Sequence, residues 1–190
     1  MRIILTLTLA IFLATTLALA ASPKAAPKPA AAPNPTVAAL SKMSGQTFDV
    51  AFMRELIPAH EEAVEIAMAA TLNADHTQLL QWNQVMIDRK SNQVKKMLTW
   101  LQEAGTTPGR RSANVVTDPV KKMRSLGGAA LEQAYLPMMA SRLEQSAALS
   151  SLASTKASKP EVRSFAAQVM KTEKQEAAML RTWLKQWYNK

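Results

Sequence analysis

Histidine and methionine are the side chains in this sequence that could bind a metal, and no cysteine accompanies them. The chain has two histidines, His60 and His76, which is too few for a multi-histidine catalytic metal centre. Its eleven methionines supply thioether sulfurs, which are soft donors that suit Cu(I). The lack of cysteine excludes disulfides, thiolate zinc or iron–sulfur sites and a cysteine nucleophile.

His60 lies near the middle of an apolar stripe on a predicted helix. At 100° per residue, one face of that helix collects Phe52, Met53, Leu56, Ile57, Ala63, Val64 and Ala67 around it. An imidazole that faces an interior needs a hydrogen-bond partner or a metal. No side chain one turn away from His60 on the same helix can act as such a partner or as a second metal ligand. Any partner must therefore come from another helix. A hydrogen-bonded core histidine and a metal ligand therefore both stay open.

A metal site, if there is one, is expected inside the protein at the level of His60. The candidate ligands are His60, Met86 and Met170, followed by Met139 or Met53. One imidazole and two sulfurs would favour Cu(I) over Zn(II) or Fe(II). Lys90 is expected at the same level and opposes a cation there. The methionines can equally be ordinary core side chains.

The motifs of the common hydrolases and oxidases are missing. Di-iron chemistry in a helical bundle uses Glu-x-x-His pairs, whereas Ile57 and Asn73 stand three residues before the two histidines. No phosphate-binding loop, nucleophile elbow or zinc-protease motif is present. We therefore expect a protein that is not an enzyme, with His76 as a solvated residue in a first helical turn.

Hydrophobic periodicity and stop signals predict the helices that must position these residues. Four long helices are expected at about 47–72, 75–104, 129–154 and 158–187. Asp75 is the predicted cap of the second helix, and Ser158, with Glu161 at the capping-box position, that of the fourth. A short helix opened by Asp118-Pro119 is expected in the connection between the second and third.

The two halves of the chain align without a gap at an offset of 83 residues. The paired positions include Phe52 with Tyr135, Trp82 with Phe165, and Thr99-Trp100-Leu101 with Thr182-Trp183-Leu184. This repetition predicts two copies of one helical hairpin, 47–104 and 128–188, forming a four-helix bundle over 46–188. Lys90 and Glu173 are equivalent under the offset and both fall on apolar faces. An ion pair inside the bundle is therefore expected, because an unpaired buried charge is costly.

The N-terminal segment indicates export. Residues 1–20 have one charge, Arg2, then an apolar run ending in Ala18-Leu19-Ala20, the small-x-small pattern of signal-peptide cleavage sites. The mature chain is expected to begin at or near Ala21, in the periplasm or outside the cell; a retained membrane anchor is the alternative. Residues 21–45, rich in proline, alanine and lysine, are expected to form an extended tether.

The charge of the chain restricts its partners. Its formal net charge is +9, which becomes +8 once Arg2 leaves with residues 1–20. For an exported protein this favours anionic envelope polymers or lipid rather than nucleic acid. The connection 105–127 is basic and the first long helix acidic, so the connection either contacts an anionic surface or lies across that helix. The basic residues are Arg110, Arg111, Lys121, Lys122 and Arg124.

One stretch resembles a known family. Residues 51–67, AFMRELIPAHEEAVEIA, resemble the opening signature of an exported bacterial family, domain of unknown function three hundred and five, and 97–101, MLTWL, its closing Met-x-x-Trp-Leu. The resemblance covers residues 48–104 well and 131–187 weakly. It implies a ferritin-like helical fold, and some members are associated with copper.

The sequence departs from the family pattern at positions that matter for a metal. Ala59 stands in place of the first histidine of a pair, Leu56 in place of a methionine, and Gln93 in place of a common acid. In the second copy the pair becomes Arg142-Leu143. The resemblance therefore implies a metal site only through His60 and some methionines.

Taken together, these features predict an all-α protein: a ferritin-like four-helix bundle built from two repeated hairpins. The expected function is non-enzymatic binding or buffering of a metal in the periplasm, with copper as the candidate. The alternative is a metal-free interaction module that acts through its basic surface on envelope polymers, lipid or a protein partner.

Overall fold

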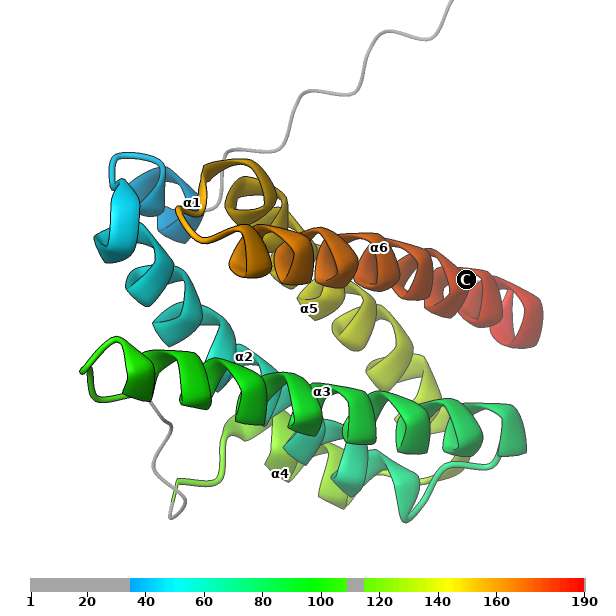
Figure 1. Cartoon of the computed structure of the whole chain (residues 1–190). Helices are drawn as coiled ribbons and strands as arrows, with labels where there is room; N and C mark the ends of the chain where they lie inside the picture. The colour runs from blue at the N-terminus through cyan, green and yellow to red at the C-terminus, as the bar shows by residue number, and fades with distance from the viewer. Residues whose placement is uncertain (1–34, 109–114, 190) are drawn as a thin grey trace, which may run out of the picture. The chain divides into compact units, whose positions relative to one another are not determined.

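The computed structural model describes residues 35–108 and 115–189, which belong to one compact unit, Pro33–Lys190. These residues form α-helices and no strand (Figure 1). The expectation of an all-α protein is confirmed. The helices are α1 (Pro35–Leu40), α2 (Gly45–Thr71), α3 (Thr77–Glu103), α4 (Asp118–Ser125), α5 (Gly128–Lys156) and α6 (Pro160–Tyr188).

The four long helices form two hairpins, α2 with α3 and α5 with α6, coloured cyan to green and yellow to red in Figure 1. Helix α5 begins 83 residues after α2, and α6 begins 83 residues after α3. The gapless offset seen in the sequence therefore describes the positions of the helix starts. Aromatic side chains pack between the two hairpins. The ring of Trp100 on α3 lies edge to face against the ring of Phe165 on α6, with the ring centroids 5.4 Å apart.

The hairpins are joined closely at the N-terminus of α5. The backbone N–H of Gly128 donates to the carbonyl oxygen of Asn73 at 2.8 Å. Gly128 has a φ of 55°, and a Cβ at this position would lie 2.9 Å from Oδ2 of Asp75. The left-handed backbone favours glycine here, whereas the carboxylate of Asp75 is the end of an exposed side chain that can move aside.

Two apolar clusters form the core, one toward each end of the long helices. The first cluster includes Ala63, Ile66, Leu79, Met86, Tyr135, Met139, Leu143, Ala177 and Leu180. The second cluster includes Phe52, Met53, Ile57, Val94, Met97, Leu149, Ala153, Phe165 and Val169. On each long helix one buried polar residue lies between the two sets. These four residues, His60, Lys90, Ser146 and Glu173, form what we call the polar layer.

Two carboxylates replace the local helix caps that the sequence predicts. Asp49 accepts hydrogen bonds from the backbone N–H groups of Ser158 and Lys159, before α6. Glu132 does the same for Asp75 and His76, before α3, with both bonds at 2.8 Å. Asp49 and Glu132 are themselves 83 residues apart. Each hairpin therefore caps the second helix of the other.

The predicted caps Asp75 and Ser158 are consequently wrong. The residues that precede the helices are His76 and Lys159, and neither makes a side-chain cap bond. The physical reason is that a buried carboxylate on the opposite hairpin already accepts the backbone N–H groups of the two residues before each helix.

Of the two short helices, α4 was predicted from the sequence and α1 was not. Helix α4 begins at Asp118 with Pro119 behind it, as predicted, and its Val120 and Met123 enter the first cluster. Helix α1 was not predicted, because it falls in the range assigned to an extended tether. It buries Leu40 in the second cluster. The expected signal peptide and the tether up to residue 34 lie outside the described residues.

None of the helices formed by the described residues is both long and apolar enough to cross a bilayer.

Candidate functional site

The polar layer is the site at which the candidate residues converge. His60 comes from α2, Lys90 from α3, Ser146 from α5 and Glu173 from α6. His60, Lys90 and Glu173 are at most 1% exposed, and Ser146 is 7% exposed. Their side chains therefore interact in a medium from which water is largely excluded, where each charge needs a partner.

The predicted ion pair between Lys90 and Glu173 is confirmed. The Nζ atom of Lys90 donates a short hydrogen bond to Oε1 of Glu173. Burial by itself would raise the pKa of Glu173, but the ammonium of Lys90 and the hydrogen bond from His60 lower it to about 2. Glu173 is therefore ionised at neutral pH. Its second oxygen, Oε2, is buried and has no hydrogen-bond partner among the described residues.

His60 is buried between the same helices. Its Nε2 lies 3.2 Å from Oε1 of Glu173 and 3.3 Å from Oγ of Ser146. Burial, followed by the positive charge of Lys90, lowers the pKa of His60 to about 4. The imidazole is therefore neutral at neutral pH, and its single proton belongs on Nε2, where the carboxylate accepts it.

The other ring nitrogen, Nδ1, then has a free lone pair. It is buried and has no hydrogen-bond partner within the described residues. Leaving a buried acceptor unpaired costs free energy. A neutral imidazole with one free lone pair is also the form in which histidine binds a metal.

The structure divides the candidate methionines among different places. Met86 and Met139 are fully buried and share the first cluster, whereas Met53 lies in the second. Met170 is half-buried on α6 and belongs to neither cluster. The set predicted around His60 is thus not gathered as a single group.

The polar layer does not contain the histidine and carboxylate cluster of a hard-metal site. Within the described part of the chain, no three histidine, aspartate or glutamate side chains come together as a metal site would need. The carboxylate of Glu173 is engaged by Lys90 and His60. Nδ1 of His60 and Oε2 of Glu173 are the polar-layer atoms left without a partner among the described residues. Nδ1 together with thioether sulfur would form a donor set that fits Cu(I) better than Zn(II), Fe(II) or Cu(II).

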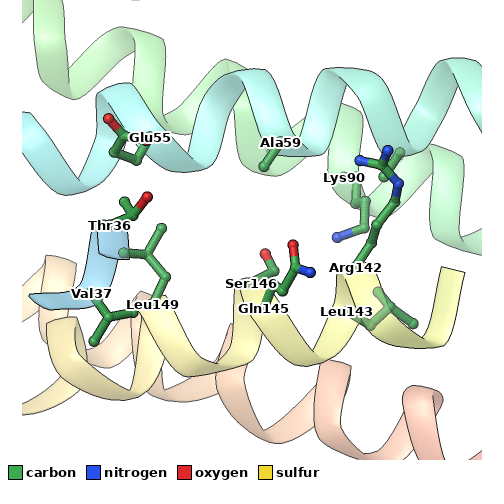
Figure 2. A pocket seen from close by; sticks show the side chains of 11 residues that line it. Thr36, Val37, Glu55, Ala59, Lys90, Arg142, Leu143, Gln145, Ser146 and Leu149 are labelled. Atoms are coloured by element: carbon green, nitrogen blue, oxygen red, sulfur yellow. The ribbon is translucent and has the colours of Figure 1, made fainter. Parts of the chain in front are cut away.

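A cavity of about 150 Å³ adjoins the polar layer between α1, α2 and α5. Figure 2 shows Lys90 reaching from α3 toward the side chains of Gln145 and Ser146 on α5. The cavity wall on α2 includes Ala59 and Ala63. Arg142 also lines it and pairs with Glu62 across the two helices at 2.5 Å.

A second polar group surrounds His76, whose side chain is 39% exposed, as expected of a solvated residue, but also has specific partners that were not expected. Nδ1 of His76 and the hydroxyl of Tyr188 each lie 2.5 Å from Oε2 of Glu132. The imidazole stacks on Trp187 with ring centroids 3.9 Å apart. Sequence spacing could not bring these residues together, because Glu132 is 56 residues from both His76 and Tyr188.

The internal repeat could have identified two functional residues that the sequence analysis did not name, Asp49 and Glu132. Asp49 and Glu132 are acids at equivalent positions of the repeat, as Lys90 and Glu173 are charges at equivalent positions. A search for charged residues at equivalent positions of the two copies would have identified both capping carboxylates. Ser146 gave no such signal, because its equivalent in the first copy is Ala63.

Comparison with known proteins gives a family and a fold. A family model described as "Domain of unknown function (DUF305)" matches residues 15–101 and 120–190. No curated protein sequence matches the chain.

Three solved structures illustrate the likeness in fold. A DUF305 protein from Streptomyces coelicolor is 19% identical, with 70% of this chain and 88% of that chain covered and a TM-score of 0.62. CopM in its Cu(I)-bound form is 19% identical, with 74% and 97% covered and a TM-score of 0.65. CopM in its Cu(II)-bound form is 18% identical, with 77% and 100% covered and a TM-score of 0.65.

Proposed function

The chain belongs to the DUF305 family, and from this premise we propose that it is a non-enzymatic, exported protein that binds and buffers Cu(I). One observation supports the proposal above the others: Nδ1 of His60 is a buried lone pair without a partner among the described residues. A metal ion at this atom would remove the cost of leaving it unpaired.

The residues named for the site follow from their surroundings. His60 would bind the metal through Nδ1, and the sulfurs of Met86 and Met139, in the neighbouring first cluster, are the thioethers best suited to join it. Met170 and Met53 come after them, because they lie outside that cluster. Bound copper would supply no chemistry beyond its own storage in this scheme.

The polar layer has a supporting role in the proposal. Glu173 orients the imidazole by accepting from Nε2 and holds its proton away from Nδ1. Burial and, after it, the positive charge of Lys90 keep the pKa of His60 low, so the lone pair stays free even in mildly acidic surroundings. The same ammonium repels a cation, which favours a monovalent ion and moderate affinity, as a buffer requires.

Copper-bound neighbours give independent support. CopM is described in Cu(I)-bound and Cu(II)-bound forms and shares this fold at a TM-score of 0.65. At 18–19% identity the likeness concerns the fold. The proposal for this chain therefore depends on its own His60 and methionines.

The test is competition for Cu(I) against a coloured chelator under anaerobic, reducing conditions. Wild type should take up one equivalent, and His60→Gln and Met86→Leu should each weaken binding. Met97→Leu is the matched control, since it also replaces a fully buried methionine, but one in the second cluster that is not a candidate ligand. Uptake that is absent, or unchanged in both His60→Gln and Met86→Leu, would refute the proposal.

The arrangement of the four long helices and the export of the protein are further parts of the proposal. We propose that the two hairpins form a four-helix bundle of the ferritin-like kind, supported by the 83-residue repetition of the helix starts. Export is supported by the sequence of residues 1–20. N-terminal sequencing of the protein from a periplasmic fraction should begin near Ala21, whereas an intact Met1 would contradict export by cleavage.

One observation favours a second candidate function, contact with an anionic envelope surface. Helix α4 presents Lys121, Lys122 and Arg124 to solvent, with Asp118 as the acid paired to Lys121 at 3.2 Å. Arg110 and Arg111 lie outside the described residues. Co-sedimentation with vesicles of phosphatidylglycerol should be lost in a variant with all three α4 cations changed to glutamine; equal binding would reject this surface.

A further inference from the structure

We propose that the cavity between α1, α2 and α5 binds a short-chain monocarboxylate. It differs from the proposed metal position, which uses Nδ1 of His60, an atom that does not line the cavity. The proposal depends on three features of the cavity: the cationic side chains that line it, its apolar walls and its volume.

Two cationic side chains line the cavity, and their N–H donors are incompletely used. Lys90 is 1% exposed and lines the cavity, and its one hydrogen bond among the described residues goes to Glu173. An ammonium has three N–H donors, so two remain. Nε of Arg142 is likewise buried without a partner in the described part of the chain. Buried N–H groups without a partner need an acceptor, and a carboxylate forms the stronger, charge-assisted hydrogen bonds with them.

The acids near the cavity leave these donors free. Glu173 is shared between Lys90 and His60, and Glu62 is engaged by Nη1 of Arg142. Glu55 lines the cavity from an exposed position on α2. A carboxylate at the mouth disfavours a second negative charge on the ligand, which restricts the class to monocarboxylates.

Apart from the polar side chains of Thr36, Gln145 and Ser146, the remaining wall is apolar, and the space is small. Leu143, Leu149, Val37, Ala59 and Ala63 line it. A volume of about 150 Å³ corresponds to roughly five water molecules. A carboxylate with a tail of two or three carbons fits both the volume and the lining. Figure 2 shows Ala59 pointing from α2 into the space opposite Ser146.

Butyrate is the probe for the test, added to the full mature chain and followed by titration calorimetry and thermal unfolding. Sodium chloride at equal ionic strength controls for salt, and butyramide is the neutral analogue. We expect butyrate to bind with a dissociation constant on the order of 1 mM and to raise the unfolding midpoint. Butyramide should bind at least about tenfold more weakly, because it lacks the charge.

Variants locate the site. Ala59→Leu fills the cavity from an exposed position on α2, and Ala148→Leu makes the same change at an exposed position of α5 that does not line it. Ala59→Leu should abolish the butyrate effect and Ala148→Leu should keep it. Arg142→Gln should weaken binding about tenfold, whereas Arg181→Gln, at an exposed ion pair, should not.

Three results would overturn the proposal: a butyrate effect no larger than that of chloride, equal binding of butyramide, or butyrate binding unchanged in Ala59→Leu or Arg142→Gln. The comparison of the two ligands uses wild-type protein and so does not depend on how any variant folds. Copper uptake is measured separately, so this result leaves the metal proposal untouched.

Discussion

Replacing Glu173 by glutamine tests the central ion pair most directly. The change keeps the size of the side chain and one acceptor oxygen but removes the negative charge. Lys90 then has a buried ammonium with no carboxylate to neutralise it, because the carboxyl group of Glu173 is the acid with which it pairs. We expect a large loss in the free energy of unfolding.

The magnitude can be worked out in two ways. Lowering the pKa of Glu173 from 4.5 to about 2 corresponds to about 3 kcal/mol, at about 1.4 kcal/mol per pKa unit. Removing one partner of a buried ion pair costs about 3–5 kcal/mol in general. Both lead to an expected loss of roughly 3–5 kcal/mol at neutral pH.

Urea unfolding followed by circular dichroism measures this loss. Glu144→Gln is the matched control, since Glu144 pairs with Arg181 where both side chains are 49% exposed, and it should cost less than about 1 kcal/mol. The pH dependence adds a signature. A depressed carboxyl pKa stabilises the fold above pH 4.5, and that contribution is lost as the pH falls toward 2. Glu173→Gln should lack this part of the acid transition.

A double variant measures the interaction energy between Lys90 and Glu173 apart from their interactions with neighbouring residues. Lys90→Met combined with Glu173→Met removes both charges, so it should be far more stable than the sum of the two single losses, by about 3 kcal/mol or more. The reasoning fails if Glu173→Gln is as mild as Glu144→Gln. It also fails if the two single losses simply add.

Three further predictions concern the other buried polar groups. The pKa of His60 is lowered from 6.5 to about 4, so wild type should lose about 3 kcal/mol as the pH falls across that interval, and His60→Gln should not; identical pH profiles would contradict this. Glu132→Gln should cost about 2–4 kcal/mol in urea unfolding, because the carboxylate accepts two backbone N–H groups and the hydroxyl of Tyr188. Tyr135→Phe should cost about 1–2 kcal/mol, since its hydroxyl donates to Oδ1 of the buried Asn83 at 2.6 Å; a neutral change would mean that Asn83 finds another donor.

Local sequence was sufficient for the long helices and for their repetition. Helix formation depends on periodic apolar residues and on breakers within a few positions, and both are visible without tertiary information. The helix starts therefore agree with prediction to within about two residues, and Asp118-Pro119 opens α4 as expected. Helix α1 was missed, because six residues with a single buried leucine carry no periodic signal.

The ion pair could be predicted because it follows from the repeat. Lys90 and Glu173 occupy equivalent positions of two similar hairpins, so packing the hairpins together brings them to the same level. Opposite charges on otherwise apolar faces then have one low-energy arrangement. The prediction thus needed only the offset and the cost of burying a charge.

What the sequence by itself determined is therefore the set of helices, their duplication, the buried position of His60 and the pairing of Lys90 with Glu173. Tertiary structure alone decided that Ser146 joins His60, that the methionine candidates do not gather in one cluster, and that Asp49 and Glu132 cap helices of the opposite hairpin. The reason is distance along the chain. Helices form from contacts within a turn or two, whereas these groups lie 50 to more than 100 residues apart, and only the packing of the hairpins brings them within bonding distance.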